Sequence, residues 1–176
     1  RAGQFNVILN GQVLLIRQSE CANPNIALHE ILHALGFDHS SNENNIMYEI
    51  SKCAQTLGDD IPRFIDELYS IPSKPDLTFE EVSPLIHDGK YLDLNMTIKN
   101  IGLKNSEKAF INIYLDNEVF QKIDLKELQI GSGMKITIQN LKLKTTNFNE
   151  IKFIIESDFE ELNKANNEES FKIEDK

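Results

Sequence analysis

The sequence lacks three features that would place it in a specialised class of protein. It has no run of about eighteen apolar residues, so no segment is expected to cross a membrane. It has no basic excess either, because residues 1–75 carry five Lys/Arg against nine Asp/Glu, the remainder carries thirteen against nineteen, and the net charge is −10. Since phosphate backbones require a basic surface, nucleic acid is not an expected partner. Only two cysteines occur, too few for a disulfide framework.

The composition is that of a globular protein. The chain has 176 residues, of which 26% are charged and 40% hydrophobic, and this predicts one domain or two small ones. The N-terminus lacks the charged-then-apolar pattern of a signal peptide and begins with Arg1. We therefore expect a mature or trimmed product, or a piece of a longer protein.

The first part of the chain predicts a hairpin followed by a helix. Residues 5–16 contain two strand-like runs joined by Asn10-Gly11, a dipeptide favoured in two-residue hairpin turns, so we expect a β-hairpin. A helix should follow, with Asn23 as its N-cap and Pro24 at the first helical position. No residue breaks the helical pattern before Gly36.

A loop and a second helix are expected next. Residues 40–58 have no clear period and are predicted to be loop. From Asp59 or Asp60 to about Ser70, apolar residues recur at helical spacing, which predicts an amphipathic helix.

Residues 71–75 contain two of the five prolines and mark a domain boundary. Proline stiffens the chain and cannot continue a helix, so we expect a first domain of residues 1–71, a linker of residues 72–75 and a second domain of residues 76–176. Beyond the linker the apolar residues alternate with period two, as in half-buried strands. The alternating runs lie at residues 92–98, 109–115, 136–138 and 151–155. This pattern predicts an all-β sandwich of about seven short strands.

Residues 29–39 contain three of the four histidines. Positions i and i+4 share one face of a helix, so His29 and His33 present two imidazoles to the same point, as zinc ligation requires. Gly36 allows a positive φ and a sharp turn, which brings back His39 as a third ligand. Three protein ligands leave a fourth position for water, as in catalytic zinc sites.

Glu30 lies one residue beyond His29, about 100° around the helix. From there its carboxylate can reach a water at the metal without being a ligand. We therefore expect one Zn²⁺ per chain and Glu30 as the general base of peptide-bond hydrolysis. The alternatives are a chance cluster of surface histidines and a relic that no longer binds metal.

The pattern H-E-x-x-H-x-x-G-x-x-H resembles the signature of metzincin zinc metallopeptidases. His39-Ser40 followed by Asn45–Tyr48 is similar to the matrixin branch of that family. By this resemblance Met47 is the Met-turn residue, which forms a hydrophobic floor beneath the zinc. Matrixins usually have a proline after the tyrosine, whereas this chain has Glu49, so the shape of the specificity pocket is not carried over.

The metzincin resemblance spans residues 5–70 only. A complete metzincin domain has most of its sheet and further helices before the active-site helix, so we expect a partial α+β zincin-type domain: a fragment, a proteolytic product or a minimal variant. The resemblance implies a protein or peptide substrate that lies extended along an edge strand, for which residues 5–16 are the candidates. The metzincin resemblance is also compatible with bound Ca²⁺, although the sequence shows no calcium-binding motif.

The second half resembles the CARDB domain, an immunoglobulin-like sandwich common on prokaryotic extracellular proteins. The residues that carry this resemblance are Pro75-Asp76-Leu77, residues 98–102, residues 131–133, Glu161, Asn163 and Asn166-Asn167. It implies a secreted or cell-surface protein of prokaryotic type. No chemistry is expected in this half: His87 is interpreted as a turn residue, and the carboxylates from Glu156 to Glu161 as a solvated face.

Cys21 and Cys53 bracket the histidine motif. The extracellular context implied by the CARDB resemblance favours a disulfide between them. Two reduced, buried thiols are one alternative. A cysteine as a fourth zinc ligand is another, which would fill the open position.

The two halves together predict a zinc endopeptidase with a β-sandwich appended. The rival is a non-catalytic extracellular binding or adhesion protein in which the truncated peptidase half is a scaffold. The intact set of His29, Glu30, His33 and His39 favours the enzyme, and the short N-terminal part favours the rival.

Overall fold

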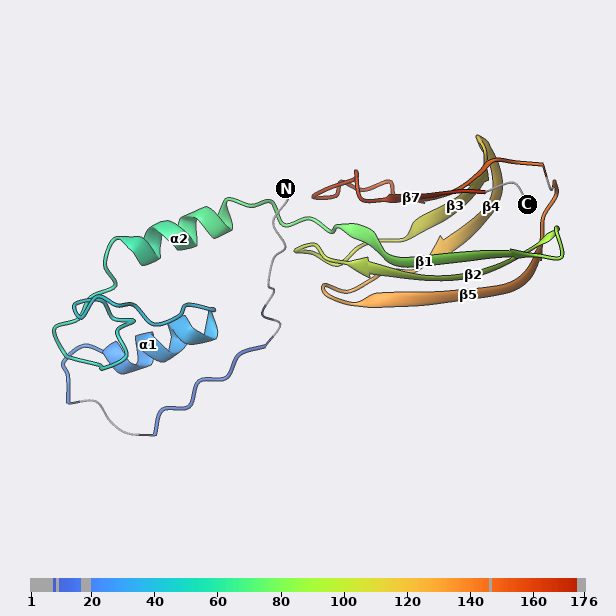
Figure 1. Ribbon diagram of the computed structural model, residues 1–176. Helices are drawn as coiled ribbons and strands as arrows, with labels where there is room; N and C mark the ends of the chain where they lie inside the picture. Colours follow the sequence, from blue (N-terminus) through green and yellow to red (C-terminus); the bar gives the residue numbers. More distant parts are fainter. Residues whose placement is uncertain (1–7, 9, 17–19, 146, 174–176) are drawn as a thin grey trace. The chain divides into compact units, whose positions relative to one another are not determined.

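The computed structural model describes residues 8, 10–16, 20–145 and 147–173 (Figure 1). The chain divides into two compact units, one of residues 8–71 and one that begins at Pro72. We call them the helical unit and the sandwich unit.

The helical unit contains α1 (Asn25–Ala34) and α2 (Asp60–Tyr69), at the two places where the sequence predicts helices. The start of α1 differs by one residue from the prediction. Pro24 occupies the N-cap position, and Asn23 accepts the N–H of Asn25 through its backbone carbonyl at 2.8 Å rather than through its side chain. Gly36 has φ +92°, so it ends the helix by the turn that only glycine adopts without strain.

The segment between the helices is loop, as expected. Two isolated parallel bridges hold it together, Ser40 with Tyr48 and Asn45 with Thr56. The unit buries a small apolar core of Leu32, Ile46, Met47 and Ile61.

The β-hairpin expected over residues 5–16 is not found in the described part of that segment. Residues 10–16 lie in no strand and are exposed, while residues 5–7 and 9 lie outside the described residues. A two-stranded hairpin is marginal without a third strand or a packed face. Among the described residues the helical unit has no strand that could pair with it.

The sandwich unit consists of two antiparallel sheets, which confirms the predicted β-sandwich. One sheet has the order β1 (Leu77–His87), β2 (Tyr91–Asn100), β5 (Gly133–Lys142). The other has the order β4 (Glu118–Leu125), β3 (Ala109–Leu115), β6 (Glu150–Glu156), β7 (Glu168–Lys172). The two sheets face each other in Figure 1.

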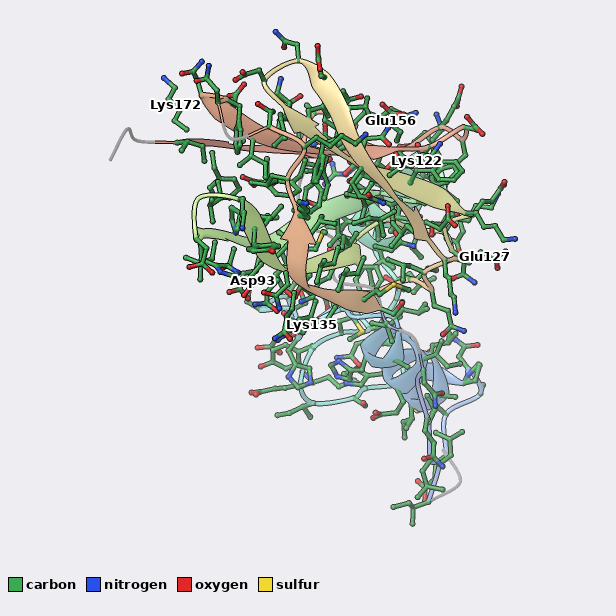
Figure 2. All side chains as sticks on the ribbon, turned by 90° about the vertical axis from the view of Figure 1, so that its right-hand side faces the viewer. Asp93, Lys122, Glu127, Lys135, Glu156 and Lys172 are labelled. Carbon is green, nitrogen blue, oxygen red and sulfur yellow. A yellow bond between two sulfur atoms is a disulfide. The ribbon has the colours of Figure 1, made fainter. Side chains whose placement is uncertain are left out.

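The predicted alternation places the core between the sheets. The fully buried positions on β2, β3 and β6 include Leu92, Leu94, Met96, Ile98, Ile111, Ile113, Ile151 and Phe153. Ile136 and Ile138 on β5 are only half-buried because β5 is an edge strand. Charged residues such as Lys122, Lys135 and Glu156 are exposed and project outward (Figure 2).

The prediction that the carboxylates from Glu156 to Glu161 form a solvated face is wrong at one position. Glu156, Asp158 and Glu160 are exposed, but Glu161 is only 9% exposed. Its carboxylate accepts the backbone N–H of Leu77 at 2.7 Å, a buried donor that would otherwise be unpaired.

Candidate metal centre

Three histidines of the helical unit converge on one point. His29 and His33 lie one turn apart on α1, with their Nε2 atoms 3.0 Å apart. The chain turns at Gly36 and returns, so that Nε2 of His39 lies 3.1 Å from Nε2 of His33. One ligand atom from each of the three residues lies within 4.8 Å of the others. The structure thus brings together the three histidines that the sequence singled out.

The second nitrogen of two of these rings determines the tautomer. Nδ1 of His29 lies 2.7 Å from the carbonyl oxygen of Ile46, and Nδ1 of His33 lies 2.8 Å from that of Phe37. A carbonyl oxygen only accepts hydrogen bonds, so each Nδ1 carries a proton, and in the neutral tautomer of each ring the lone pair is at Nε2. Such carbonyl partners orient the histidine ligands of metal sites.

The convergence of these lone pairs fits a metal ion. The Nε2 atoms of His29 and His33 lie 3.0 Å apart, and in the neutral tautomers their two lone pairs can share one cation. Nitrogen ligands about 2.0–2.1 Å from a tetrahedral zinc are about 3.3 Å apart, close to the observed spacing. Neutral imidazoles are also ligands that zinc prefers.

Burial decreases across the site. His29 is buried, His33 is half-buried and His39 is exposed. Glu30 is half-buried on α1 and does not belong to the group of converging ligand atoms. Its position is therefore compatible with a base that acts beside the metal rather than with a ligand.

Met47 lies in the small core of the helical unit and is 2% exposed. Its carbonyl accepts the N–H of Ser40, the residue after His39, at 2.8 Å. The neighbouring carbonyl of Ile46 holds His29 at 2.7 Å. The two residues at this turn therefore hold both segments that carry histidines, α1 at His29 and the loop beside His39.

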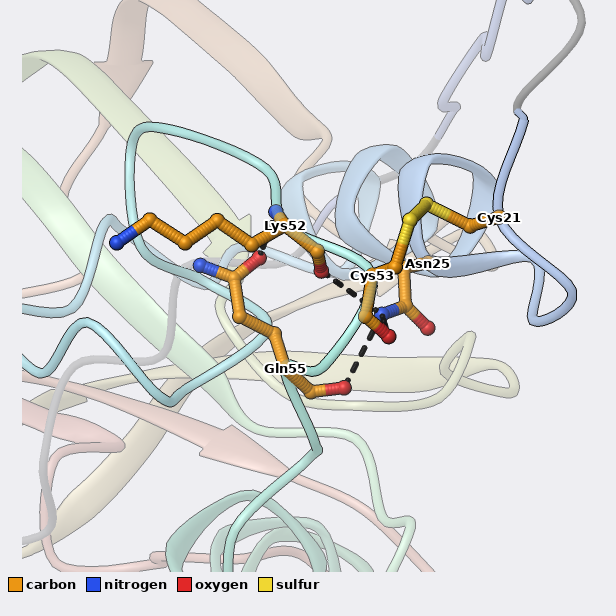
Figure 3. The surroundings of a disulfide bond; sticks show 5 residues. All are labelled: Cys21, Asn25, Lys52, Cys53 and Gln55. Carbon is orange, nitrogen blue, oxygen red and sulfur yellow. Dashed lines mark hydrogen bonds between the residues drawn. A yellow bond between two sulfur atoms is a disulfide. The ribbon is translucent and has the colours of Figure 1, made fainter.

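The disulfide between Cys21 and Cys53 is formed, as expected (Figure 3). Beside it, the buried Nδ2 of Asn25 donates to the carbonyls of Lys52, Cys53 and Gln55 at 3.2, 3.2 and 3.1 Å. These contacts join the first turn of α1 to the loop after Met47. Reduced thiols and a cysteine as zinc ligand are both excluded by the disulfide.

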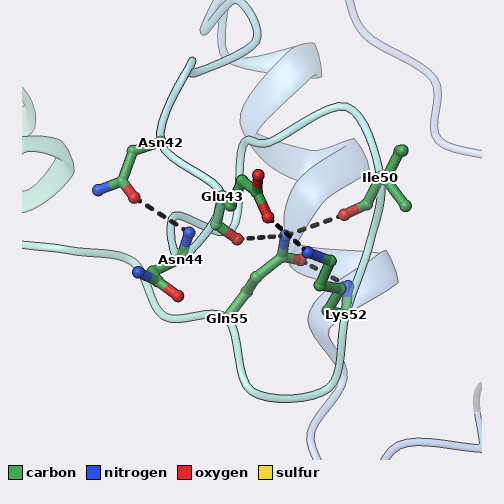
Figure 4. A network of polar contacts seen from close by, with 6 residues as sticks. All are labelled: Asn42, Glu43, Asn44, Ile50, Lys52 and Gln55. Carbon is green, nitrogen blue, oxygen red and sulfur yellow. Dashed lines mark hydrogen bonds and ion pairs between the residues drawn. The ribbon is translucent and has the colours of Figure 1, made fainter.

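A second buried amide shapes the same loop (Figure 4). Gln55 donates to the carbonyls of Glu43 at 3.0 Å and Ile50 at 2.9 Å, and it accepts the N–H of Lys52 at 2.7 Å. On the outside, the Lys52 ammonium donates to Glu43 at 2.8 Å, and this hydrogen bond and charge lower the pKa of the Glu43 carboxyl.

Sequence reasoning missed the buried amides Asn25, Asn45 and Gln55. Asn45 accepts the N–H of Met47 at 2.8 Å and donates to Asp60 at 3.2 Å. Amide residues in a loop ordinarily predict exposure. The one available signal is that Asn25 and Asn45 lie between the two cysteines, with Gln55 two residues after the second.

The fold defines an immunoglobulin-like sandwich joined to a helical unit with a three-histidine centre. The family model of CARDB matches residues 74–171, more than half of the chain. The chain therefore belongs to the CARDB family. The family model of Matrixin matches residues 15–70, about a third of the chain, and this similarity covers the histidine cluster.

Other comparisons are distant. No curated protein matches the chain. Among solved structures, β-glucosidase 3B from Thermotoga neapolitana in complex with glycerol is 14% identical, with a TM-score of 0.36 over 67% of this chain and 20% of that one. Its complex with glucose is 14% identical, with a TM-score of 0.35 over 65% and 20%. The chain thus spans about a fifth of the length of these structures.

Proposed function

We propose that the helical unit holds the zinc site of a metal-dependent endopeptidase. The observation that carries the proposal is the convergence of the Nε2 atoms of His29, His33 and His39, with Nδ1 of the first two committed to carbonyl oxygens. The matrixin similarity of residues 15–70 supports the same assignment.

The residues of this unit have distinct roles in the proposed reaction. A zinc ion held by the three histidines would polarise a scissile carbonyl and acidify water. Glu30 accepts the proton of the attacking water at its carboxylate and returns it to the nitrogen of the leaving amine. Met47 is buried in the core of the helical unit, and its proposed role is the hydrophobic floor beneath the zinc. The substrate class is an unfolded protein or peptide.

A non-catalytic binding or adhesion protein is the second candidate. One observation favours it: residues 10–16 form no strand, so the described residues offer no sheet edge beside α1 along which a substrate could lie. Membership of the CARDB family is consistent with a binding role.

An extracellular location is part of the proposal. A disulfide persists in oxidising compartments, and Cys21–Cys53 is such a bond. No helix in the described part of the chain is long and apolar enough to span a bilayer.

The test combines zinc stoichiometry with cleavage of casein by the zinc-loaded chain. We expect one zinc per chain, loss of zinc and cleavage in His33→Ala, and loss of cleavage alone in Glu30→Gln. His87→Ala, which changes the fourth histidine, is the matched control and should retain both properties. Zinc binding without cleavage would favour the binding protein, and absence of zinc after loading would overturn both the metal site and the peptidase.

A further inference from the structure

Two carboxylates of the sandwich unit are buried without a cationic partner. Asp76, just before β1, is 5% exposed, and Glu161, in the loop between β6 and β7, is 9% exposed. The lysines near them in sequence are engaged elsewhere, since Lys74 pairs with Glu160 at 2.7 Å and Lys164 donates to the carbonyl of Ser157 at 3.2 Å. Among the described residues neither carboxylate forms a salt bridge.

The two carboxylates lie close enough to affect each other. Burial raises the pKa of Asp76, the negative charge of Glu161 raises it further, and the hydrogen bond from Asn166 opposes both effects. Ionised carboxylates are costly to bury unless they are paired or coordinate a metal. Neutral donors satisfy part of this need, because Glu161 accepts from Ser157 at 2.6 Å and from Asn167 at 3.0 Å.

Two amide oxygens at the same place have no partner. Asn166 donates its Nδ2 to Asp76 at 2.9 Å, and Asn167 donates its Nδ2 to Glu161 at 3.0 Å. The Oδ1 atoms of both residues are buried and accept no hydrogen bond, and Asn167 as a whole is 4% exposed. Reversing either amide would place its oxygen against a carboxylate oxygen, so a flip does not give these amides a full set of partners.

A buried oxygen without a partner in a native fold needs an explanation, and a bound water or ion supplies one. Each orphaned Oδ1 belongs to an amide group that already contacts one of the two carboxylates, Asn166 at Asp76 and Asn167 at Glu161. Water could donate to these oxygens, but it would leave the two negative charges uncompensated. A divalent cation satisfies the oxygens and the charges together.

We propose that Asp76, Glu161, Asn166 and Asn167 form a Ca²⁺ site that joins the start of β1 to the loop between β6 and β7. The ligands are all oxygens, as hard cations prefer, and Ca²⁺ accepts irregular sets of carboxylates, amide carbonyls and waters. Mg²⁺ requires a more regular octahedron and loses its water less readily. This site is independent of the histidine cluster and of the proposed peptidase activity.

The test is calcium titration of the full chain after removal of metals, by calorimetry and by thermal unfolding. Wild type should bind one Ca²⁺, and the melting temperature of the sandwich unit should rise by on the order of 10 °C when free Ca²⁺ exceeds its Kd about 100-fold. Asp76→Asn should weaken binding at least about tenfold, because it removes a charged ligand. Without calcium, the same variant should melt no lower than wild type, since it removes a buried, unpaired charge.

Asp158→Asn, an exposed carboxylate of the same loop, is the matched control and should bind Ca²⁺ like wild type. If Asp76→Asn does not fold, Asn166→Ala tests the site by removing an amide oxygen, and it too should weaken binding. A melting temperature independent of Ca²⁺, an equal response to Mg²⁺, or equal binding by the site variant and Asp158→Asn would overturn the proposal.

Discussion

The Nε2 atoms of His29 and His33 face each other at 3.0 Å, and the opposite nitrogen of each ring is held by a backbone carbonyl. The carbonyls therefore select the tautomer and the ring orientation before any ion binds. Preorganisation of this kind reduces the cost of ordering the ligands on binding.

Metal removal should destabilise the helical unit. We expect a zinc chelator to lower its melting temperature in scanning calorimetry, because binding to the folded state alone stabilises that state. Added zinc should restore the transition, and His39→Ala should respond less than wild type. His87→Ala should respond like wild type. An unchanged transition in the presence of chelator would contradict the prediction.

Asn45→Ala should loosen the turn that carries Ile46 and Met47. The substitution leaves the buried N–H of Met47 without its acceptor at 2.8 Å and costs about 1–3 kcal/mol in unfolding free energy. Zinc affinity should fall roughly tenfold, because the carbonyl of Ile46 orients His29. Asn42→Ala, which removes an exposed contact to the N–H of Asn44, should change stability by less than about 0.5 kcal/mol. Denaturant unfolding and competition with a zinc chelator measure the two effects.

Reduction of Cys21–Cys53 should destabilise the helical unit without abolishing zinc binding. The bond closes a sequence separation of 32, which corresponds to about 3–4 kcal/mol on the loop-entropy model. Asn25 still joins α1 to the same loop through its three hydrogen bonds. Urea unfolding of the Cys21→Ser, Cys53→Ser double variant tests this. A midpoint identical to that of wild type would show that the bond contributes nothing.

The pKa of His87 should depend on Asp93. Partial burial lowers this pKa, but hydrogen bonds to Asp93 at 3.2 Å and Asp88 at 3.3 Å outweigh it, and the net shift is upward from 6.5. The stability that the charged imidazole contributes is therefore complete below pH 6.5 and is lost as pH rises through the folded-state pKa.

The pKa of Asp93 is shifted in the opposite direction, downward. The backbone N–H of Asn140 at 2.7 Å, and then His87, lower its pKa from 3.8, so its contribution is present above pH 3.8 and disappears as pH falls through the folded-state value. Asp93→Asn should lower the pKa of His87 in an NMR titration. Asp158→Asn should leave it unchanged. Equal pKa values of His87 in wild type and Asp93→Asn would refute the coupling.

Residues 72–176 should fold alone. The sandwich unit has its own core, formed between its two sheets. A β-type circular dichroism spectrum and a cooperative melt are expected of this fragment. A disordered spectrum would show that the sandwich requires the helical unit.

Local patterns predicted much of the fold and of the site. The spacing of His29 and His33 placed both rings on one face of a helix, and the alternation along β2, β3 and β6 placed the core. The strands at the edges of the sheets were harder to predict. β1, β4 and β7 lie at sheet edges and have irregular burial, although the edge strand β5 alternates. The hairpin expected over residues 5–16 required a further strand to pack against, which the described helical unit does not have.

The sequence by itself determined which residues share a face, because helical and strand periods are properties of the local backbone. It therefore specified the ligand-bearing helix, the turn at Gly36 and the alternating core. Only the tertiary structure decided which distant groups satisfy one another: the carbonyl of Ile46 at His29, Asn25 beneath the loop at Cys53, and Glu161 at the N–H of Leu77. Those contacts depend on the requirement that buried polar groups find partners, and no period in the chain encodes which partner that is.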